Sequence, residues 1–124
     1  MILLDSSAWL ELFANGPQAP LFRERVSEPG PVIVPSVVIY EIYKITCRLK
    51  GEEAAEQTAA YLREFEVIGF DEDLAIQAAE VSLLHGLAFA DSVVYATGQL
   101  YGATVVTSDA HFEGLPGVEY VPKR

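Results

Sequence analysis

The chain contains a single cysteine, Cys47, among its 124 residues. One thiol cannot form an intrachain disulfide, and it cannot supply the thiolate cluster of a structural zinc site. We interpret Cys47 as a small apolar residue on a helix. Long apolar runs are also lacking, since no stretch reaches the roughly 20 residues of a membrane-spanning helix. The N-terminus shows no basic segment followed by an apolar core, so we expect a cytoplasmic protein with no secretory signal and no membrane contact.

Basic residues are scarce. The chain has 8 Lys and Arg against 18 Asp and Glu, which gives a formal net charge of −10 at pH 7. Proteins bind nucleic acids largely by neutralising phosphates with Lys and Arg. We therefore do not expect this chain to coat RNA or DNA non-specifically. This argument against nucleic-acid binding weakens if several of the carboxylates hold divalent cations, although the remaining net charge is still negative.

Apolar residues are plentiful, at 51% of the chain, and they occur in short runs without repeats or linkers. We expect one domain over residues 1–124, large enough to bury a core. Short apolar or β-branched runs predict strands at residues 1–4, 31–35, 66–70, 103–107 and 118–121. Amphipathic patterns predict helices at residues 8–13, 19–27, 37–49, 52–64, 71–85 and 89–101, with Ser36 as the N-cap of the third.

The alternation of these strands and helices predicts an α/β fold. Right-handed crossovers would build three layers, in which helices flank a central, mostly parallel sheet of four to five strands. In such sheets ligands bind beyond the carboxyl ends of the strands. Asp5 directly follows the first predicted strand, and Asp109 comes two residues after the strand at 103–107. We therefore expect these two carboxylates at the same edge of the sheet.

Glu41 lies within an apolar stripe of the third predicted helix. Val38, Ile42, Ile45 and Leu49 recur with it at steps of three and four residues, which places them on one helical face. An ionised carboxylate on such a face is unfavourable unless a positive charge meets it. Either the stripe is slightly rotated and Glu41 reaches solvent, or Glu41 points at a metal ion.

Asp91 lies in the first turn of the helix predicted at 89–101. Taken alone it is explained by the helix dipole, as Asp109 alone is explained by turn chemistry. Together with Asp5 and Glu41, however, these residues would place four carboxylates in one crevice. Like charges that close raise one another's pKa and destabilise the fold. Mg²⁺ or Mn²⁺ would offset the repulsion, because these hard cations take carboxylate oxygens and water as ligands.

Four short strings in this order resemble the motifs of PIN domains, and among these the VapC-type toxins of prokaryotic toxin–antitoxin pairs. The strings are Ile2-Leu3-Leu4-Asp5-Ser6-Ser7, Val37 to Glu41, Ala90-Asp91-Ser92 and Thr107-Ser108-Asp109 with Phe112. Each is short, but their order and spacing extend over nearly the whole chain. The resemblance implies a PIN-like fold and an Mg²⁺-dependent endoribonuclease that hydrolyses RNA phosphodiester bonds, with Mn²⁺ as the alternative cation.

The same resemblance assigns roles to particular residues. It implies that the catalytic metal ligands are Asp5, Glu41, Asp91 and Asp109. It also implies Ser6 and Thr107 as hydroxyl neighbours that orient ligands or water. The expected partners are an RNA substrate, a small antitoxin that lays a basic side chain across the acidic crevice, and a second copy of the chain.

Lys44 and Arg48 follow Glu41 by three and seven residues, on the same side of the predicted helix. We interpret them as RNA contacts at the rim of the crevice, with a purely solvated role at the helix C-terminus as the alternative. His85 lies where a helix ends and His111 lies in a loop. We interpret both histidines as capping or surface residues rather than as general bases.

Two other functions fit the same layering. A receiver module that accepts a phosphoryl group would use Asp5 in an acidic pocket, with Asp71, Thr107 and Lys123 at other strand ends. Against it, Asp5 is followed by two serines rather than by a second acid, and Asp71 is explained as a helix cap. The other alternative is a catalytically silent PIN-like module that only binds a partner, which the retention of all four acids argues against.

Overall fold

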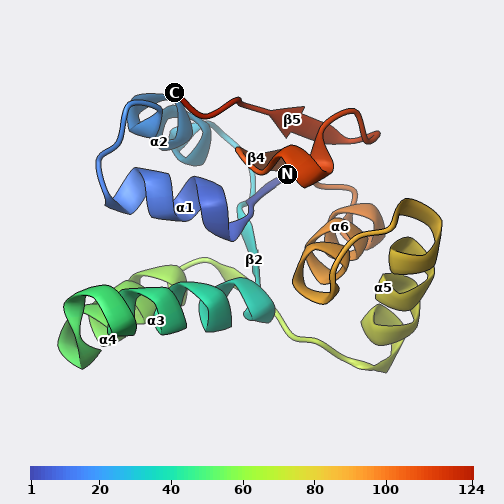
Figure 1. Cartoon of the computed structure of the whole chain (residues 1–124), viewed down its shortest axis with the longest axis horizontal. Coiled ribbons are helices and arrows are strands. Elements are labelled where there is room, and N and C mark those ends of the chain that lie inside the picture. Colours follow the sequence, from blue (N-terminus) through green and yellow to red (C-terminus); the bar gives the residue numbers. More distant parts are fainter.

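A computed structural model describes residues 1–124, in which helices and strands alternate along the chain (Figure 1). The elements are β1 (Ile2–Leu4), α1 (Ser6–Phe13), α2 (Ala19–Ser27), β2 (Ile33–Pro35), α3 (Ser36–Lys50), α4 (Glu52–Leu62), β3 (Glu66–Ile68), α5 (Glu72–His85), α6 (Phe89–Tyr101), β4 (Thr104–Thr107), η1 (Ala110–Phe112) and β5 (Val118–Tyr120). All of the predicted elements are present, with boundaries that differ by a few residues. The short 3₁₀ helix η1 was not predicted.

The strands run parallel in two ladders. One has the order β1-β4-β5 and the other pairs β2 with β3. A bridge between Ile2 and Val32 joins the ladders at β1 and β2, so the five strands follow the spatial order β3-β2-β1-β4-β5. This confirms the predicted α/β fold with a parallel sheet. Because every strand points the same way, the carboxyl ends of β1 and β4 meet at one edge.

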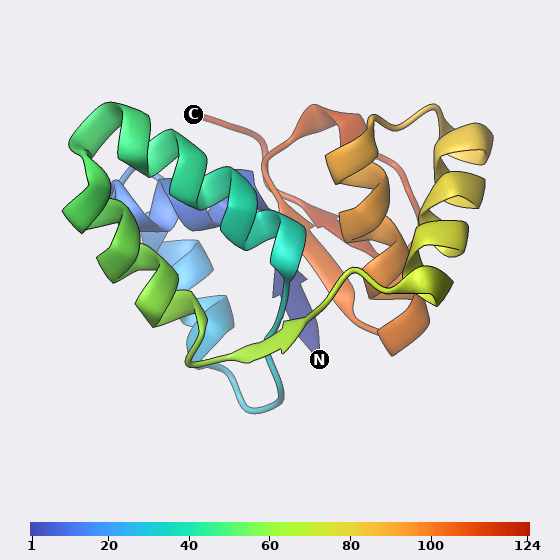
Figure 2. The ribbon, with the colours of Figure 1, turned by 90° about the horizontal axis from the view of Figure 1, so that it is seen from below.

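Helices cover both sides of the strands. In Figure 2, α1 to α4 lie on one side and α5 and α6 on the other. The core between these layers is apolar, and its largest fully buried side chains include Trp9, Phe22 and Phe112. Burial of such side chains is the main favourable term in folding. None of the helices has the length and apolar character needed to cross a bilayer.

Two helices begin at aspartate caps, whereas the predicted serine cap is wrong. Asp5 accepts the Ala8 N–H at the start of α1, and Asp71 accepts the Leu74 N–H at the start of α5. Ser36 is instead the first residue of α3, whose N-cap is Pro35 and has no side-chain cap hydrogen bond. The reason is that β2 runs directly into α3, which leaves no separate residue for a cap.

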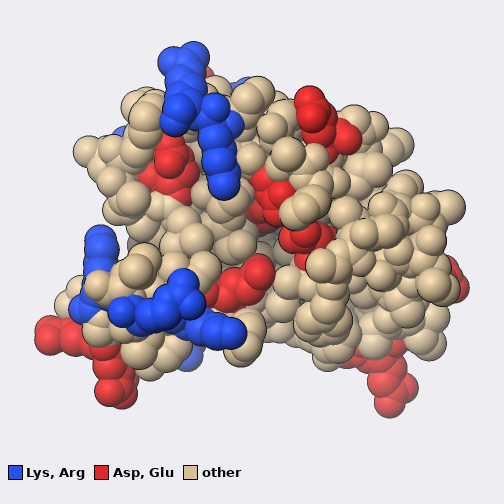
Figure 3. Space-filling model, viewed as in Figure 1, with Lys and Arg blue, Asp and Glu red and all other residues tan.

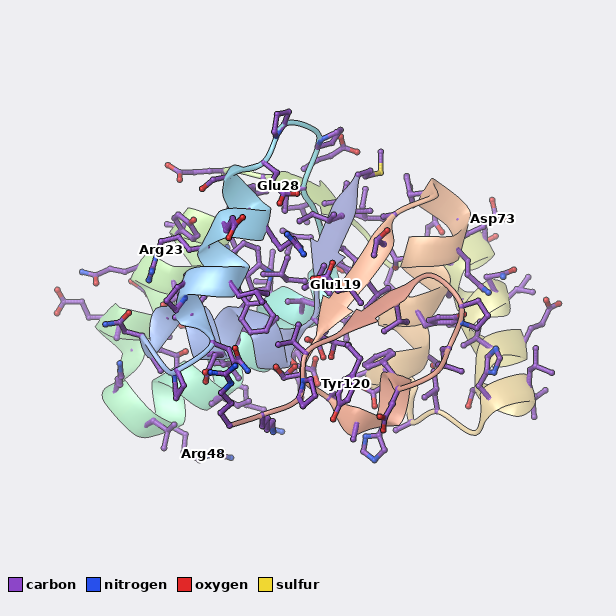
Figure 4. The ribbon with its side chains drawn as sticks, turned by 90° about the horizontal axis from the view of Figure 1, so that it is seen from above. Arg23, Glu28, Arg48, Asp73, Glu119 and Tyr120 are labelled. Atoms are coloured by element: carbon purple, nitrogen blue, oxygen red, sulfur yellow. The ribbon has the colours of Figure 1, made fainter.

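The edge strand β5 is tied to α2 by an ion pair. The Arg25 Nε donates to Glu119 at 2.9 Å, and its Nη1 contacts Glu28 at 2.8 Å. Figure 4 shows Glu119 on β5 and Glu28 at the end of α2. The neighbouring Arg23 projects from the other side of α2, away from β5 (Figure 4). This contact holds the C-terminal part of the chain against the N-terminal helices.

Candidate active site

Asp5 lies at the carboxyl end of β1 and is 3% exposed. Its Oδ1 accepts hydrogen bonds from the Ser7 hydroxyl at 2.7 Å and from the Ala8 N–H at 3.1 Å. Its Oδ2 accepts a hydrogen bond from the Thr107 hydroxyl at 2.8 Å. The carboxylate is therefore fixed in orientation, and Oδ2 keeps a lone pair free to accept a further partner.

Asp109 is brought to the same edge by β4. Its backbone N–H donates to the Thr107 Oγ1 at 2.8 Å, and this hydroxyl in turn donates to Asp5. Thr107 thus joins the segments that follow β1 and β4. The prediction that Asp5 and Asp109 meet at one edge of the sheet matches this arrangement.

Glu41 and Asp91 reach the site from α3 and α6. Glu41 is half-buried on the second turn of α3, and Asp91 is half-buried on the first turn of α6. Each lies close enough to other acids for their charges to raise its pKa. The charges of Asp5 and Asp109 raise the pKa of Glu41, and those of Asp109 and Glu41 raise the pKa of Asp91. All four predicted acids therefore converge on one part of the molecule.

The electrostatics of this cluster are unfavourable without a counter-charge. Burial raises the pKa of Asp5 to about 6, while hydrogen bonds from Ser7, Thr107 and Ala8 oppose this shift. Burial and then the charge of Asp109 raise the pKa of Asp91 to about 6. Burial also raises the pKa of Glu41, against a hydrogen bond from the Ser6 side chain. No Lys or Arg forms an ion pair with any of the four acids.

His111 is the one basic side chain in contact with the acids, and its position could not be predicted from the sequence. Its Nδ1 lies 2.9 Å from the Asp109 Oδ1 and 3.5 Å from the Asp91 Oδ2. The imidazole is 75% exposed, so its contacts with the two carboxylates are open to solvent. It is positioned by η1, where Asp109 caps the turn and accepts the His111 N–H. The three side chains together bring one ligand atom each within 4.8 Å of one another.

The two adjacent serines contact different acids of the cluster. Ser7 contacts Asp5, and its Oγ also accepts the Ser108 N–H at 3.1 Å. Ser6 hydrogen bonds to Glu41 instead. Both hydroxyls thus orient acids of the cluster, but only Ser6 and Thr107 were singled out from the sequence. Strand-to-helix geometry decides which serine faces Asp5, and the string Asp5-Ser6-Ser7 does not reveal it.

Lys44 and Arg48 are exposed, as expected for rim residues. They line a groove of about 740 Å³ between α3 and α4 that also includes Tyr40, Tyr43 and Arg63. The Lys44 ammonium lies 5.7 Å from the centre of the Tyr40 ring. Glu41 is not part of this groove, so the groove occupies an adjoining face of α3 rather than the crevice itself.

The surface around the acids is mixed in charge (Figure 3). Acidic side chains gather near the centre of this face, in the hollow between α3 and η1. Basic side chains gather over α3 and beside the C-terminal end of the chain, on opposite sides of the hollow. On this face of the molecule, basic side chains thus flank the acidic hollow.

The donor set fits a hard divalent cation. Carboxylate oxygens are the preferred ligands of Mg²⁺ and Mn²⁺, which also retain several waters. The cluster supplies buried and half-buried carboxylates without a Lys or Arg partner, and Asp5 is held by hydrogen bonds that fix the direction of its free lone pair. Such outer-sphere support is typical of metal ligands.

The receiver alternative finds no support in the arrangement. Asp71 is exposed, and its carboxylate caps α5. It follows β3, which pairs with β2 at the far side of the sheet from β4. The acidic pocket of a receiver would need Asp71 beside Asp5, and the strand order separates them.

Comparisons with known proteins agree with the fold. A chain of a toxin–antitoxin complex from Klebsiella pneumoniae superposes with a TM-score of 0.82 at 22% identity, over 96% of each chain. VapC20 of Mycobacterium tuberculosis, a toxin that cleaves the sarcin–ricin loop, gives 0.76 at 23% identity, over 100% of this chain and 99% of that one. VapBC2 of Rickettsia felis, solved with a DNA fragment of its promoter, gives 0.75 at 16% identity over 100% of both. No curated protein sequence matches.

The sequence itself matches a family model. The model of the PIN domain aligns with residues 2–118 and so spans all four acids and both ladders of the sheet. The chain therefore belongs to the PIN domain family.

Proposed function

We propose that the chain is a metal-dependent endoribonuclease that uses Mg²⁺, or alternatively Mn²⁺. The proposed metal ligands and catalytic residues are Asp5, Glu41, Asp91 and Asp109. The observation that carries the proposal is the convergence of these acids from four separate segments without a Lys or Arg partner. Burial raises the pKa of three of them, Asp5, Glu41 and Asp91. A carboxylate cluster of this kind destabilises the fold unless it binds a cation.

In this mechanism the protein acts mainly by holding and orienting. When bound, the cation would polarise the scissile phosphodiester, acidify the attacking water and stabilise charge on the departing oxygen. Asp5 offers a rigid carboxylate, because Ser7, Ala8 and Thr107 all donate to it. Thr107 fixes the relative positions of Asp5 and Asp109 through its shared hydroxyl. Glu41 is more exposed and can hold the water, with Ser6 orienting its carboxylate.

RNA is the substrate class that the comparisons support. VapC20, which shares the fold over the full length of this chain, cleaves the sarcin–ricin loop. Lys44 and Arg48 would contact substrate phosphates at the rim, and the other basic side chains around the hollow provide the same attraction (Figure 3). Local cations of this kind allow an acidic protein to bind RNA.

We further propose that the chain is the toxin of a type II toxin–antitoxin pair. Structural neighbours include a toxin–antitoxin complex and promoter-bound VapBC2, in which such chains occur with their antitoxins. The antitoxin would place a basic side chain over the acidic crevice and so block the cation or the RNA. Co-expression with the neighbouring gene of its operon should yield a complex without nuclease activity. A chain that purifies alone, and that is harmless when expressed, would contradict the toxin assignment.

A homodimer is the third part of the proposal. Exposed apolar side chains gather on α5 and at the start of α6, where Ile76, Leu83, Leu84 and Phe89 are each more than 60% exposed. Contiguous apolar patches of this kind mark interfaces. We place the contact with the second copy of the chain on this face, which lies on the opposite side of the sheet from α1 to α4 (Figure 2).

The decisive test compares RNA cleavage by the wild type and by Asp5→Asn. We expect the wild type to cut total RNA with Mg²⁺ and to stop in EDTA, and Asp5→Asn to lose at least a hundredfold in rate. The matched control is Asp71→Asn, which changes the other aspartate cap and should leave cleavage unchanged. Activity that survives EDTA or the Asp5 substitution would remove the mechanism. A chain that binds the antitoxin but leaves RNA intact after the antitoxin has been removed would instead favour the catalytically silent module.

A further inference from the structure

A small polar recess lies directly beside the acidic cluster. It has a volume of about 100 Å³ and no apolar side chain in its lining. The lining residues are Ser7, Glu11, Gln18, Ser108, Lys123 and Arg124. Ser7 connects the recess to the active site, because the same hydroxyl that lines it donates to Asp5 at 2.7 Å. Ser108 precedes Asp109 in the chain and so provides a second connection.

The Ser108 hydroxyl is a buried polar group without a protein partner. The residue is 4% exposed, and its Oγ makes no hydrogen bond to any other group of the chain. Buried hydroxyls are nearly always paired, because an unpaired one loses its hydration without compensation. The Ser108 N–H is satisfied by the Ser7 Oγ, so the unpaired group is the side chain alone. The Ser108 hydroxyl is therefore available to donate to a molecule that enters the recess.

The segment that leads to the two basic residues of the recess is anchored to the rest of the chain. The Gln18 Nε2 donates to the Pro122 carbonyl at 3.0 Å, which anchors the segment immediately before Lys123 and Arg124. Gln18 is buried and its N–H donates to Glu11 at 2.8 Å. Figure 3 shows basic side chains beside the C-terminal end of the chain, next to the acidic hollow. The recess therefore combines an unpaired hydroxyl donor with two cations.

We propose that this recess binds a backbone phosphate of the RNA next to the phosphate that is cut. The inference rests on the proposed ribonuclease function and extends it by naming a second contact point for the strand. Ser108 donates its hydroxyl to a phosphate oxygen, and Lys123 and Arg124 supply the charge. The site fixes the strand so that the neighbouring phosphodiester lies over the carboxylate cluster.

An anion fits the recess better than a cation does. Glu11 is its only acid, and one oxygen of that carboxylate already accepts the Gln18 N–H. Two basic side chains against one acid leave a positive balance, whereas a hard cation would need several carboxylates. Water also fits the recess, and measurements of RNA affinity distinguish a recess that holds only water from one that binds a phosphate.

Binding of a fluorescein-labelled single-stranded RNA tests the proposal without depending on cleavage. Asp5→Asn serves as the background, so that the RNA stays intact. Adding Ser108→Ala together with Lys123→Gln should raise the dissociation constant roughly tenfold at low salt. The slope of log affinity against log salt should also fall by about 0.7, the value for one phosphate contact on a single strand. The control is Arg23→Gln, which removes an exposed charge on the far side of α2 and should leave both values nearly unchanged.

A second measurement locates the phosphate. Neutral methylphosphonate linkages would be introduced into the RNA one position at a time. At one position the neutral linkage should weaken binding to Asp5→Asn. The same linkage should not weaken binding further when Ser108→Ala and Lys123→Gln are added to that background. Ser108→Ala alone should keep or raise the melting temperature, since it removes an unpaired buried hydroxyl. Unchanged affinity and salt slope in the recess variants would show that the recess holds only water and would overturn the inference. Failure of the wild type to cut RNA would instead overturn the proposed function.

Discussion

At the scale of single residues, the chain keeps Asp5 buried and charged at neutral pH with no cation of its own beside it. The carboxylate caps α1 and accepts two hydroxyls, but these contacts only partly offset its burial, because its pKa is still raised. Proteins tolerate such groups where they serve binding or catalysis. The free energy of unfolding of the metal-free protein should therefore be lowered by the charged form of Asp5.

The first prediction concerns pH. Burial raises the pKa of Asp5 from its ordinary 3.8 to about 6. Between these values the folded chain holds a proton that the unfolded chain has released, so this group makes the free energy of unfolding fall as the pH rises. Above pH 6 its penalty is fully present and amounts to about 3 kcal/mol at most. Urea unfolding in EDTA, followed by circular dichroism, measures the effect.

Asp5→Asn isolates that contribution from all other titrating groups. The amide oxygen can still cap α1, and the amide nitrogen can donate to the Thr107 Oγ. We expect this variant to be more stable than the wild type at pH 7 and to lose most of this advantage near pH 4.5. Mg²⁺ should stabilise the wild type and leave the variant unaffected. An equal stability difference at both pH values would refute the argument.

The second prediction concerns His111. Its imidazole contacts Asp109 and Asp91 but is 75% exposed, and exposed ion pairs contribute little. We expect His111→Ala to keep the cleavage rate and the affinity for Mg²⁺ within about threefold of the wild type. Asp109→Asn, as the comparison, should lose both by more than about tenfold. A tenfold weaker affinity in His111→Ala would identify the imidazole as a metal ligand.

The residue scale also shows what the sequence could and could not predict. Asp5 and Asp109 could be placed together because strand ends of a parallel sheet meet at one edge. His111 could not be placed, because its position depends on the 3₁₀ turn that Asp109 caps. The roles of Ser6 and Ser7 depend on which direction each faces at the start of α1. The unpaired Ser108 hydroxyl is likewise visible only once burial is known.

At the scale of elements, α6 approaches β4 closely through Gly98. A Cβ at this position would lie 2.9 Å from the Val105 Cγ2 and 3.1 Å from the Ala103 carbonyl oxygen. The backbone oxygen cannot rotate out of the way as a side chain can. Gly98 thus lets the helix that bears Asp91 lie directly on the strand that leads to Asp109.

The third prediction follows from this contact. Gly98→Ala should lower the free energy of unfolding by about 1–3 kcal/mol, because the clash outweighs the gain of about 1 kcal/mol in helix propensity. It should also weaken Mg²⁺ binding, since α6 must shift and carries Asp91 with it. Chemical denaturation and metal titration measure the two effects. Gly69→Ala is the control, because a Cβ there meets nothing within 4 Å; equal effects of both substitutions would contradict the explanation.

Element types were predictable because their patterns are local. The apolar stripe of α3 correctly marks Val38 and Ile42 as buried, and Glu41 on that face is half-buried. Leu49 was predicted to lie on the same stripe but is 71% exposed. It lies in the last turn of α3, beyond the part of the helix that packs on the core. The N-cap of α3 was wrong for a different reason, since the direct passage from β2 into α3 leaves no linker. Such junctions depend on tertiary packing rather than on local preference.

At the scale of the whole molecule, the exposed apolar face of α5 is the surface that we propose for contact with a second copy of the chain. Leu83 is 88% exposed and Leu84 is 78% exposed, and in a dimer both would be removed from water. Burial of a leucine side chain contributes roughly 1.5–3 kcal/mol. The loss of several such contacts from one interface should be sufficient to separate the copies.

The fourth prediction is that Leu83→Lys with Leu84→Lys yields a monomer. Sedimentation or light scattering would measure the mass at micromolar concentration, and circular dichroism would show that the fold is retained. Leu49→Lys is the control, because Leu49 is also highly exposed, at 71%, but lies on α3. A wild type that is already monomeric, or a variant that remains dimeric, would rule out this face as the interface.

The spatial order of the strands also determines when, during synthesis of the chain, the carboxylate cluster can be completed. β1 emerges first from the ribosome, yet it lies beside β4, which is among the last parts of the chain to be made. Until β4 is released, one edge of β1 has no partner, and Asp5 lacks both the Thr107 hydroxyl and the nearby Asp109. Unfinished chains therefore lack the complete carboxylate cluster, which can form only when translation is nearly finished.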